Sequence, residues 1–182
     1  MRLTHLYAAL ALTASTALAA SAQTTSAPAV EPGAWSVTPF LSLALGGDGD
    51  SSSLGVGGAA GYDFTDVLSA EGELAYVFDL AGDSDSADWS VLSLSGNALY
   101  HFPLENGMAP YATAGLTLAR SNLSIADTTA DTAEFGVNVG GGIKMPFTDR
   151  LTARADVRYF KYIDTAPDGF RLYGGLMWRL GR

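Results

Sequence analysis

The sequence contains no cysteine, which excludes disulfide scaffolds, thiol catalysis and cysteine-bound zinc or iron–sulfur sites. Basic residues are also few. The 10 Lys and Arg against 19 Asp and Glu give a net charge of −9, which argues against nucleic-acid binding, because phosphates require a basic surface. Charged residues make up only 16% of the chain, below the roughly 25% that is typical of soluble domains.

Long apolar runs are missing as well, except at the N-terminus. No other stretch approaches the length of about 18 apolar residues that a membrane-spanning helix requires. The chain of 182 residues is nevertheless 48% hydrophobic and suits a single domain. This combination favours a protein that meets a membrane through something other than helices.

The first 22 residues have the pattern of an export signal. Met1–His5 is short and basic, an apolar run rich in Ala and Leu follows, and Ala20–Ala22 supplies the small residues that signal peptidase requires. We predict that residues 1–22 are a cleaved signal peptide and not an uncleaved anchor helix. Gln23–Gly33 is rich in Pro, Ser and Thr, so we expect a flexible lead-in before the domain at 34–182.

From Trp35 onward, apolar residues recur at every second position. The clearest runs are Leu68–Phe78 and Phe135–Met145, in which each apolar residue is followed by a polar or small one. This alternation is typical of β-strands with one apolar face. We find no amphipathic helix, so the sequence predicts an all-β fold.

An internal repeat gives the number of strands. Phe64–Ala70 and Phe147–Ala153 nearly match, and each joins two alternating runs through a Thr-Asp turn. Midway between them, Phe102–Met108 contains a proline and an Asn-Gly pair, which also indicate a turn. Three short turns on one side, with two further strands at each end of the domain, predict eight strands.

The other connections are longer and polar. They cover residues 46–52, 79–88, 121–132 and 164–169. Short turns that alternate with long loops are typical of an up-and-down barrel whose two ends differ. An even number of antiparallel strands lets the last strand pair with the first, which leaves no open edge. We therefore predict an eight-stranded antiparallel up-and-down β-barrel.

The composition of the two faces distinguishes a soluble, lipocalin-like barrel from a transmembrane one. The polar face consists mostly of Ser, Gly, Ala and Thr with few charges, which suits a narrow filled interior better than a water-facing surface. Strand runs of about 10 residues match the length that crosses a bilayer at a tilt. Aromatic residues near the run ends on the apolar face predict interfacial girdles. They are Trp35, Tyr62, Phe64, Phe78, Tyr100, Phe102, Tyr159 and Trp178.

Several motifs point to a known family. They are the Pro-aromatic openings Pro39-Phe40 and Pro110-Tyr111, the two Phe-Thr-Asp-x-Leu turns, and Val157–Tyr159. With them, the chain resembles the small outer-membrane β-barrel family of the OmpA transmembrane domain and OmpX, one type of porin-family barrel protein, over about Ala34 to Arg182. The resemblance implies a place in the outer membrane of a Gram-negative-type envelope, with outer-membrane lipid and the outer-membrane assembly machinery as partners.

The inward face carries charges at matching heights. When the two repeated turns are aligned, Glu71 meets Arg154, Glu73 meets Asp156, and Arg158 follows on the same face. Ion pairs across such a narrow lumen would be strongly coupled. Two hypotheses remain open: a structural salt-bridge plug, which we favour because eight strands leave room only for side chains, and a gate along a narrow ion path. The predicted lumen charge network comprises Glu71, Glu73, Glu134, Lys144, Arg154, Asp156 and Arg158.

Acidic residues gather at the end with the long loops. Two short stretches resemble fragments of calcium loops but lack the bidentate Glu and the full spacing, so a solvated acidic surface is the favoured interpretation. The acidic loop cluster comprises Asp48, Asp50, Asp83, Asp85 and Asp88.

Catalysis finds little support. After signal removal the only histidine is His101, and a Ser-His-acid site would need a serine beside it near the lipid headgroups. We expect a monomeric, non-enzymatic outer-membrane barrel with a side-chain-filled lumen and a structural or surface-interaction role. No cofactor, metal site or nucleic-acid partner is expected. A narrow channel for ions or small solutes is the alternative, and a lipid-modifying barrel enzyme is the third reading.

Overall fold

The computed structural model describes residues 28–46, 52–79, 88–125, 128–163 and 168–180. The predicted signal peptide and the start of the predicted lead-in lie outside these residues. Eight β-strands make up the fold within them. They are β1 (Trp35–Gly46), β2 (Ser52–Asp63), β3 (Leu68–Asp79), β4 (Asp88–His101), β5 (Ala109–Ile125), β6 (Thr128–Pro146), β7 (Leu151–Tyr162) and β8 (Gly169–Leu180).

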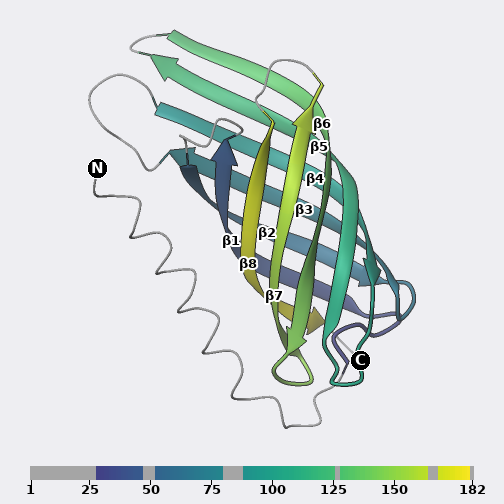
Figure 1. Ribbon diagram of the computed structural model, residues 1–182. Helices are drawn as coiled ribbons and strands as arrows, with labels where there is room; N and C mark the ends of the chain where they lie inside the picture. Colours follow the sequence, from purple (N-terminus) through teal and green to yellow (C-terminus); the bar gives the residue numbers. More distant parts are fainter. Residues whose placement is uncertain (1–27, 47–51, 80–87, 126–127, 164–167, 181–182) are drawn as a thin grey trace, which may run out of the picture.

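The strands form one closed barrel in sequence order (Figure 1). Each strand pairs antiparallel with the next, and β8 returns to pair with β1 from Trp35↔Leu180 to Gly46↔Gly169. The predicted eight-stranded antiparallel up-and-down barrel is therefore confirmed. Among the described residues, no helix has the length and apolar character needed to cross a membrane.

The two repeated turns have the same hydrogen bonds. In the first, the amides of Phe64 and Thr65 both donate to the carbonyl of Leu68, at 2.9 and 3.1 Å. In the second, Phe147 and Thr148 donate to Leu151 at the same two distances. Each threonine hydroxyl also accepts from the amide of the leucine that starts the next strand. The sequence repeat thus marks two equivalent hairpins at one end of the barrel, which we call the turn end.

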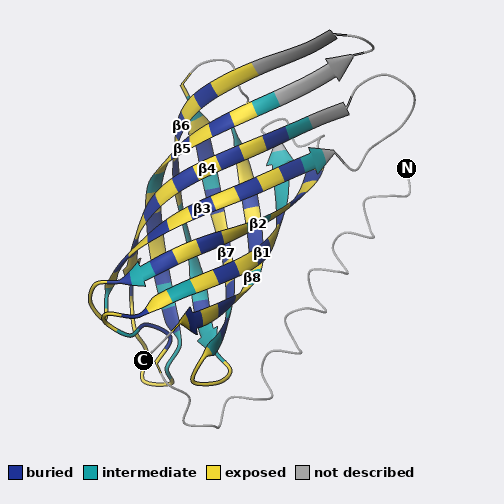
Figure 2. Ribbon diagram, turned by 180° about the vertical axis from the view of Figure 1, so that it is seen from behind, coloured by how far each residue is buried: buried dark blue, intermediate teal, exposed yellow. Residues whose placement is uncertain are grey.

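Side chains alternate strictly between the lumen and the outside, as the banding along each strand in Figure 2 shows. On β4, for example, Ser93, Ser95 and Asn97 are buried, whereas Leu92 and Leu94 are exposed. The predicted polar face is therefore the interior, and the apolar face is the outer surface of the barrel. Large exposed aromatics near the strand ends include Trp35, Phe64, Tyr100, Phe102, Phe170 and Trp178.

β5 and β6 extend further than the sequence predicts. Their pairing continues to Ile125↔Thr128, so most of the segment 121–132, expected to be a loop, is a paired hairpin. The backbone hydrogen bonds of a strand pair do not require an apolar face. The pairing can therefore continue where the apolar alternation, which marked the other strands, has stopped.

The end of the lead-in is also ordered. Ala29 and Val30 are 1% and 5% exposed and pack against Ala109 at the start of β5. This part of Gln23–Gly33 differs from the flexible lead-in expected from its composition, because two apolar side chains in it find a buried site on the barrel. Figure 1 shows the start of the described chain, in purple, at the turn end near the C-terminus.

Candidate functional site

Five charged residues at the centre of the lumen come from two opposite walls. β3 contributes Glu71 and Glu73, and β7 contributes Arg154, Asp156 and Arg158, all at alternating inward positions. In a closed ring of eight consecutive strands, β3 and β7 are equally far apart in both directions. Contacts between these side chains therefore cross the full width of the lumen.

Arg154 connects three partners. Its Nη1 donates to Glu71 Oε2, and its Nη2 donates to Glu71 Oε1 at 3.1 Å, which makes a bidentate pair. Its Nε donates to Asp156 Oδ2 at 2.9 Å and to the hydroxyl of Tyr111 at 2.7 Å. The Tyr111 hydroxyl in turn donates to Asp156. All three nitrogens of this guanidinium therefore donate to buried acceptors.

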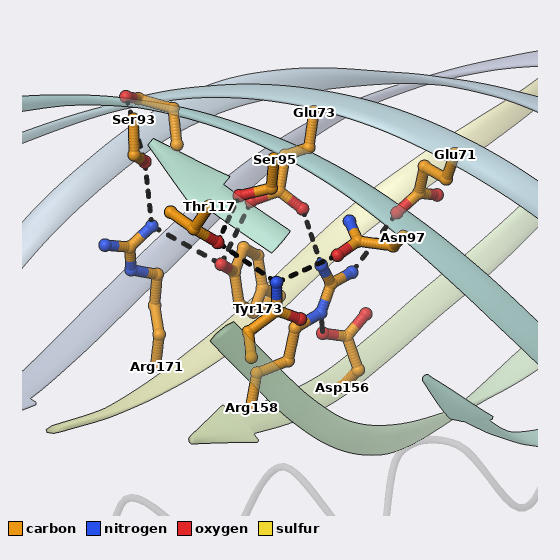
Figure 3. Close-up of polar contacts among 12 residues, drawn as sticks. Glu71, Glu73, Ser93, Ser95, Asn97, Thr117, Asp156, Arg158, Arg171 and Tyr173 are labelled. Carbon is orange, nitrogen blue, oxygen red and sulfur yellow. Dashed lines mark hydrogen bonds and ion pairs between the residues drawn. The ribbon is translucent and has the colours of Figure 1, made fainter. Parts of the chain in front are cut away.

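Arg158 binds the three carboxylates contributed by β3 and β7 (Figure 3). Its Nη1 donates to Glu73 at 2.9 Å, its Nη2 to Glu71 at 3.2 Å, and its Nε to Asp156 at 3.0 Å. Only 1% of Arg158 is exposed, and its guanidinium carbon lies 4.8 Å from the centre of the Tyr173 ring. A charge this far from water is tolerable only because its donors are matched by acceptors.

Tyr173 extends the network to a third arginine. Its hydroxyl donates to Glu73 Oε1 at 3.0 Å and accepts from Arg171 Nη1 at 3.4 Å. Arg171 also donates to Ser93 Oγ at 3.2 Å, and its guanidinium lies 4.5 Å from the centre of the Phe160 ring. Sequence reasoning missed Tyr111, Arg171 and Tyr173. The alternation along β8, with Arg171 and Tyr173 two positions apart, could have indicated two of them.

A second, uncharged layer lines the wall formed by β4, β5 and β6. Asn138 Nδ2 donates to Asn97 Oδ1 and to Thr117 Oγ1, both at 3.0 Å. Thr117 and Ser95 share a hydrogen bond of 2.9 Å. Figure 3 shows this neutral layer beside the charged one. Its hydrogen bonds stay on this wall, joining β4 to β5, β5 to β6 and β4 to β6, and do not cross to the opposite wall.

Two glycines of β6 leave space for the charged network. A Cβ on Gly140 would lie 2.8 Å from Arg158 Cγ, and a Cβ on Gly142 would lie 2.7 Å from the Tyr111 hydroxyl. Both contacts are too close for a side chain to fit. Backbone carbonyls of β7 are closer still, because the same Cβ atoms would lie 2.2 Å from the Val157 oxygen and 2.4 Å from the Ala155 oxygen. Gly140 and Gly142 are therefore explained by the close approach of the β7 backbone together with side chains of the network.

Side chains fill the lumen around the network. A cavity of about 10 Å³ lies among Phe40, Glu73, Arg158 and Tyr173. This volume corresponds to about one water molecule. The charged layer is therefore closely packed around this cavity.

The remaining predicted charges of the network come from β6. Glu134 and Lys144 are buried on the inward face of β6, with Lys144 near the turn end. In the acidic loop cluster, Asp88 is the first residue of β4, and the structure describes its backbone but not its side chain. The other four members lie outside the described residues: Asp48, Asp50, Asp83 and Asp85.

His101 lies inside the lumen, where it is 0% exposed. Its Nδ1 is 3.5 Å from Ser69 Oγ, and that hydroxyl donates to Asp63 Oδ1 at 2.5 Å. In a nucleophilic relay the serine gives its proton to the histidine. Here the serine hydroxyl is committed to the carboxylate, so the arrangement is not that of a Ser-His-acid site.

A model of the outer membrane protein beta-barrel domain family matches residues 7–179. The chain belongs to this family. No curated protein matches it in sequence. The apolar outer face of this family member is the surface that meets lipid, and the barrel is a transmembrane one.

Solved structures with the same fold are outer membrane barrels of low sequence identity. The N-terminal β-barrel domain of OprF from Pseudomonas aeruginosa is 22% identical, with a TM-score of 0.61, and the match covers 82% of this chain and 98% of that one. Neisserial surface protein A is 18% identical, with a TM-score of 0.63 and coverages of 81% and 95%. Ail, the attachment invasion locus protein of Yersinia pestis, is 17% identical, with a TM-score of 0.61 and coverages of 82% and 100%. At these identities the similarity establishes the fold alone.

Proposed function

We propose that this protein is a non-enzymatic outer-membrane barrel with a closed lumen and a structural or surface-interaction role. The observation that carries the proposal is the set of ion pairs that joins β3 to β7, Glu71 with Arg154 and Glu73 with Arg158. Long charged side chains that meet across the lumen tie opposite walls together and occupy the space that a solute would need. In this role the barrel is a rigid carrier for its loops.

Single-channel recording tests this function. The refolded protein in a planar bilayer should give no conductance steps above the baseline in salt solutions. Insertion can be verified independently by heat-modifiable migration, because a closed barrel resists SDS until it is heated. Stable, ion-selective conductance of the unaltered protein would contradict the closed-lumen function and support the alternative, a narrow channel.

The channel alternative rests on the same residues. Five charged side chains in one layer could act as a filter if the layer opened. The dense hydrogen bonding of Arg154 and Arg158 favours the closed form, because each guanidinium would have to leave several buried acceptors unpaired. The channel is therefore the second candidate.

A lipid-modifying enzyme is the least supported role. His101 is completely buried on the inward side of β4, so the barrel wall separates it from lipid. Comparison of lipid A by mass spectrometry, with and without expression of the protein, tests this role. A change in acyl chains or headgroups that depends on His101 would overturn the non-enzymatic assignment.

The same proposal includes the location and partners of the protein. We infer an outer-membrane monomer that is exported with a cleaved signal peptide of residues 1–22 and inserted by the outer-membrane assembly machinery. The family match and the apolar outer face support a location in the outer membrane. N-terminal sequencing of the protein from outer-membrane fractions should begin at Gln23.

A further inference from the structure

The residues before β1 turn back under the barrel. Glu31–Ala34 forms a β-turn in which the Ala34 amide donates to the Glu31 carbonyl at 3.1 Å. Pro32 occupies the second position, and Gly33 occupies the third with φ of 83°. This is the pattern of a type II turn, which requires a positive φ at its third residue. The turn directs the preceding residues away from β1 and across the mouth of the barrel.

The far end of this segment is fixed on the opposite side of the mouth. The Ala29 amide donates to the carbonyl of Gly107, in the turn between β4 and β5, at 3.1 Å. Ala29 and Val30 form a buried cluster with Ala109. In the closed ring, the β4–β5 turn lies opposite the junction of β8 with β1. A segment that starts at β1 and contacts this turn spans the mouth.

Two charged residues hold the near side. Arg179 of β8 donates from Nη2 to the Pro28 carbonyl at 2.6 Å and lies 3.4 Å from Glu31 Oε2. The carboxylate of Asp63, at the end of β2, accepts from the Glu31 amide at 3.2 Å. The Gly33 amide donates to the Asp63 carbonyl at 2.7 Å. The segment is therefore bound to β2, to β8 and to the β4–β5 turn.

Lys144 lies directly behind the segment. On β6 it pairs in register with Ala109, which Ala29 and Val30 cover, and on its other side with Arg154 of the charged network. Lys144 is 3% exposed and points into the lumen. It therefore occupies a space with the segment below it and the network above it.

We propose that Pro28–Ala34 is a strap that closes the turn-end mouth and seals the part of the lumen that holds Lys144. The lumen is then closed twice, by the charged network in its middle and by the strap at its end. The strap also explains why Arg179, Asp63 and Glu31 gather at one mouth. A protein whose lumen opens would have to release both closures.

The two lysines of the chain provide a built-in test. The Lys161 side chain is 65% exposed, whereas Lys144 lies behind the strap. The full-length mature chain, refolded in detergent, is treated with a water-soluble acetylating reagent, and the acetylation rate of each lysine is measured by peptide mass spectrometry. We expect rapid acetylation of Lys161 and protection of Lys144.

Release of the strap should expose Lys144 selectively. We expect Arg179→Gln combined with Glu31→Gln, and separately a deletion of residues 28–31, to speed Lys144 acetylation at least about tenfold, because reactivity follows local opening. The Lys161 rate should stay unchanged. Arg150→Gln, an exposed position in the neighbouring turn, is the matched control and should leave both rates unchanged.

Two results would overturn the strap. One is acetylation of Lys144 as fast as Lys161 in the unaltered protein. The other is unchanged protection of Lys144 in either variant that still shows heat-modifiable migration. If the deletion fails to fold, the double substitution decides, because it retains the whole segment. Acetylation reports the space behind the strap and conductance reports the whole lumen, so failure of the strap leaves the closed-lumen function standing.

Discussion

The lumen contains two polar layers that differ in what they connect. The charged layer joins β3 to β7 through Glu71, Arg154 and Arg158, so its bonds cross from wall to wall. The neutral layer of Asn97, Thr117 and Asn138 stays on one wall, where its bonds join β6 to the adjacent β5 and, past it, to β4. Charge in this barrel thus serves to bridge opposite walls, and neutral hydrogen bonds serve to line one wall.

Side-chain length explains this difference. Arg and Glu are long enough for each to reach toward the barrel axis, whereas the shorter Asn, Ser and Thr reach partners only on the same wall, at most two strands away. The two layers also differ in charge, and the costs of damage differ accordingly. A buried ion left without its partner is penalised more than a buried amide or hydroxyl in the same condition.

The largest effect should come from removing one partner of the Glu71–Arg154 ion pair, which bridges β3 and β7. Glu71→Ala or Arg154→Ala removes the bidentate pair and leaves the opposite charge buried with only part of its partners, Asp156 for Arg154 and Arg158 for Glu71. Each should lower the free energy of unfolding in detergent by about 3–5 kcal/mol. The double variant should lose less than the sum of the two. Denaturant unfolding followed by tryptophan fluorescence gives these values, and Arg150→Ala is the exposed control. Strictly additive losses would show that the pair is not coupled.

This bridge could be predicted because two sequence signals coincide. The alternation assigns Glu71 and Arg154 to the inward face, and the repeated Phe-Thr-Asp-x-Leu turns place them at the same height. The assignment of Tyr111 could not be made in this way. Aromatic residues in a barrel strand suit either face, and their hydroxyl partners depend on the stagger between strands, which the sequence does not state.

The strap shows another limit of the sequence. Pro32-Gly33 is a turn signal that can be read from the chain, and the type II turn is there. Where the residues before the turn go depends on contacts with Gly107 and Arg179, which are far away in sequence. Composition alone therefore suggested a flexible segment.

A charge introduced on the outer face of β6 tests which side of this strand meets lipid. Val139 is exposed on β6, next to the buried Asn138. Val139→Arg places a cation against lipid and should cost about 2–4 kcal/mol if the residue lies near the membrane midplane. Val139→Leu should be tolerated. The free energy of unfolding in lipid bilayers is the measurement, and equal tolerance of both substitutions would contradict the assignment of the lipid-facing side.

Damage to the neutral layer should cost less than damage to the bridge. Asn138→Ala removes the donor to Asn97 and Thr117 and leaves buried acceptors unpaired, so we expect a loss of about 1–3 kcal/mol. Leu substitution of the exposed neighbour Val137 is the control for changes on the same strand. A loss as large as that of Arg154→Ala, in the same unfolding assay, would remove the distinction between the layers.

The smallest effect should come from an ion pair in water. Asp168, before β8, accepts hydrogen bonds from Lys161 and Tyr159, and these bonds lower the pKa of its carboxyl below the ordinary value of 3.8. A lowered pKa means that the stabilisation is present above the pKa of the unfolded chain and is lost as the pH falls through the folded value. Asp168→Asn should therefore reduce the free energy of unfolding slightly at neutral pH and leave it unchanged in strong acid. Added salt should shrink even the neutral-pH difference, because solvent and counter-ions screen exposed pairs.

The same substitution in the lumen, Asp156→Asn, should lower the free energy of unfolding far more, since Asp156 accepts hydrogen bonds from both Arg154 and Arg158 away from water. Equal losses for the two variants would mean that burial does not set the strength of the charged layer.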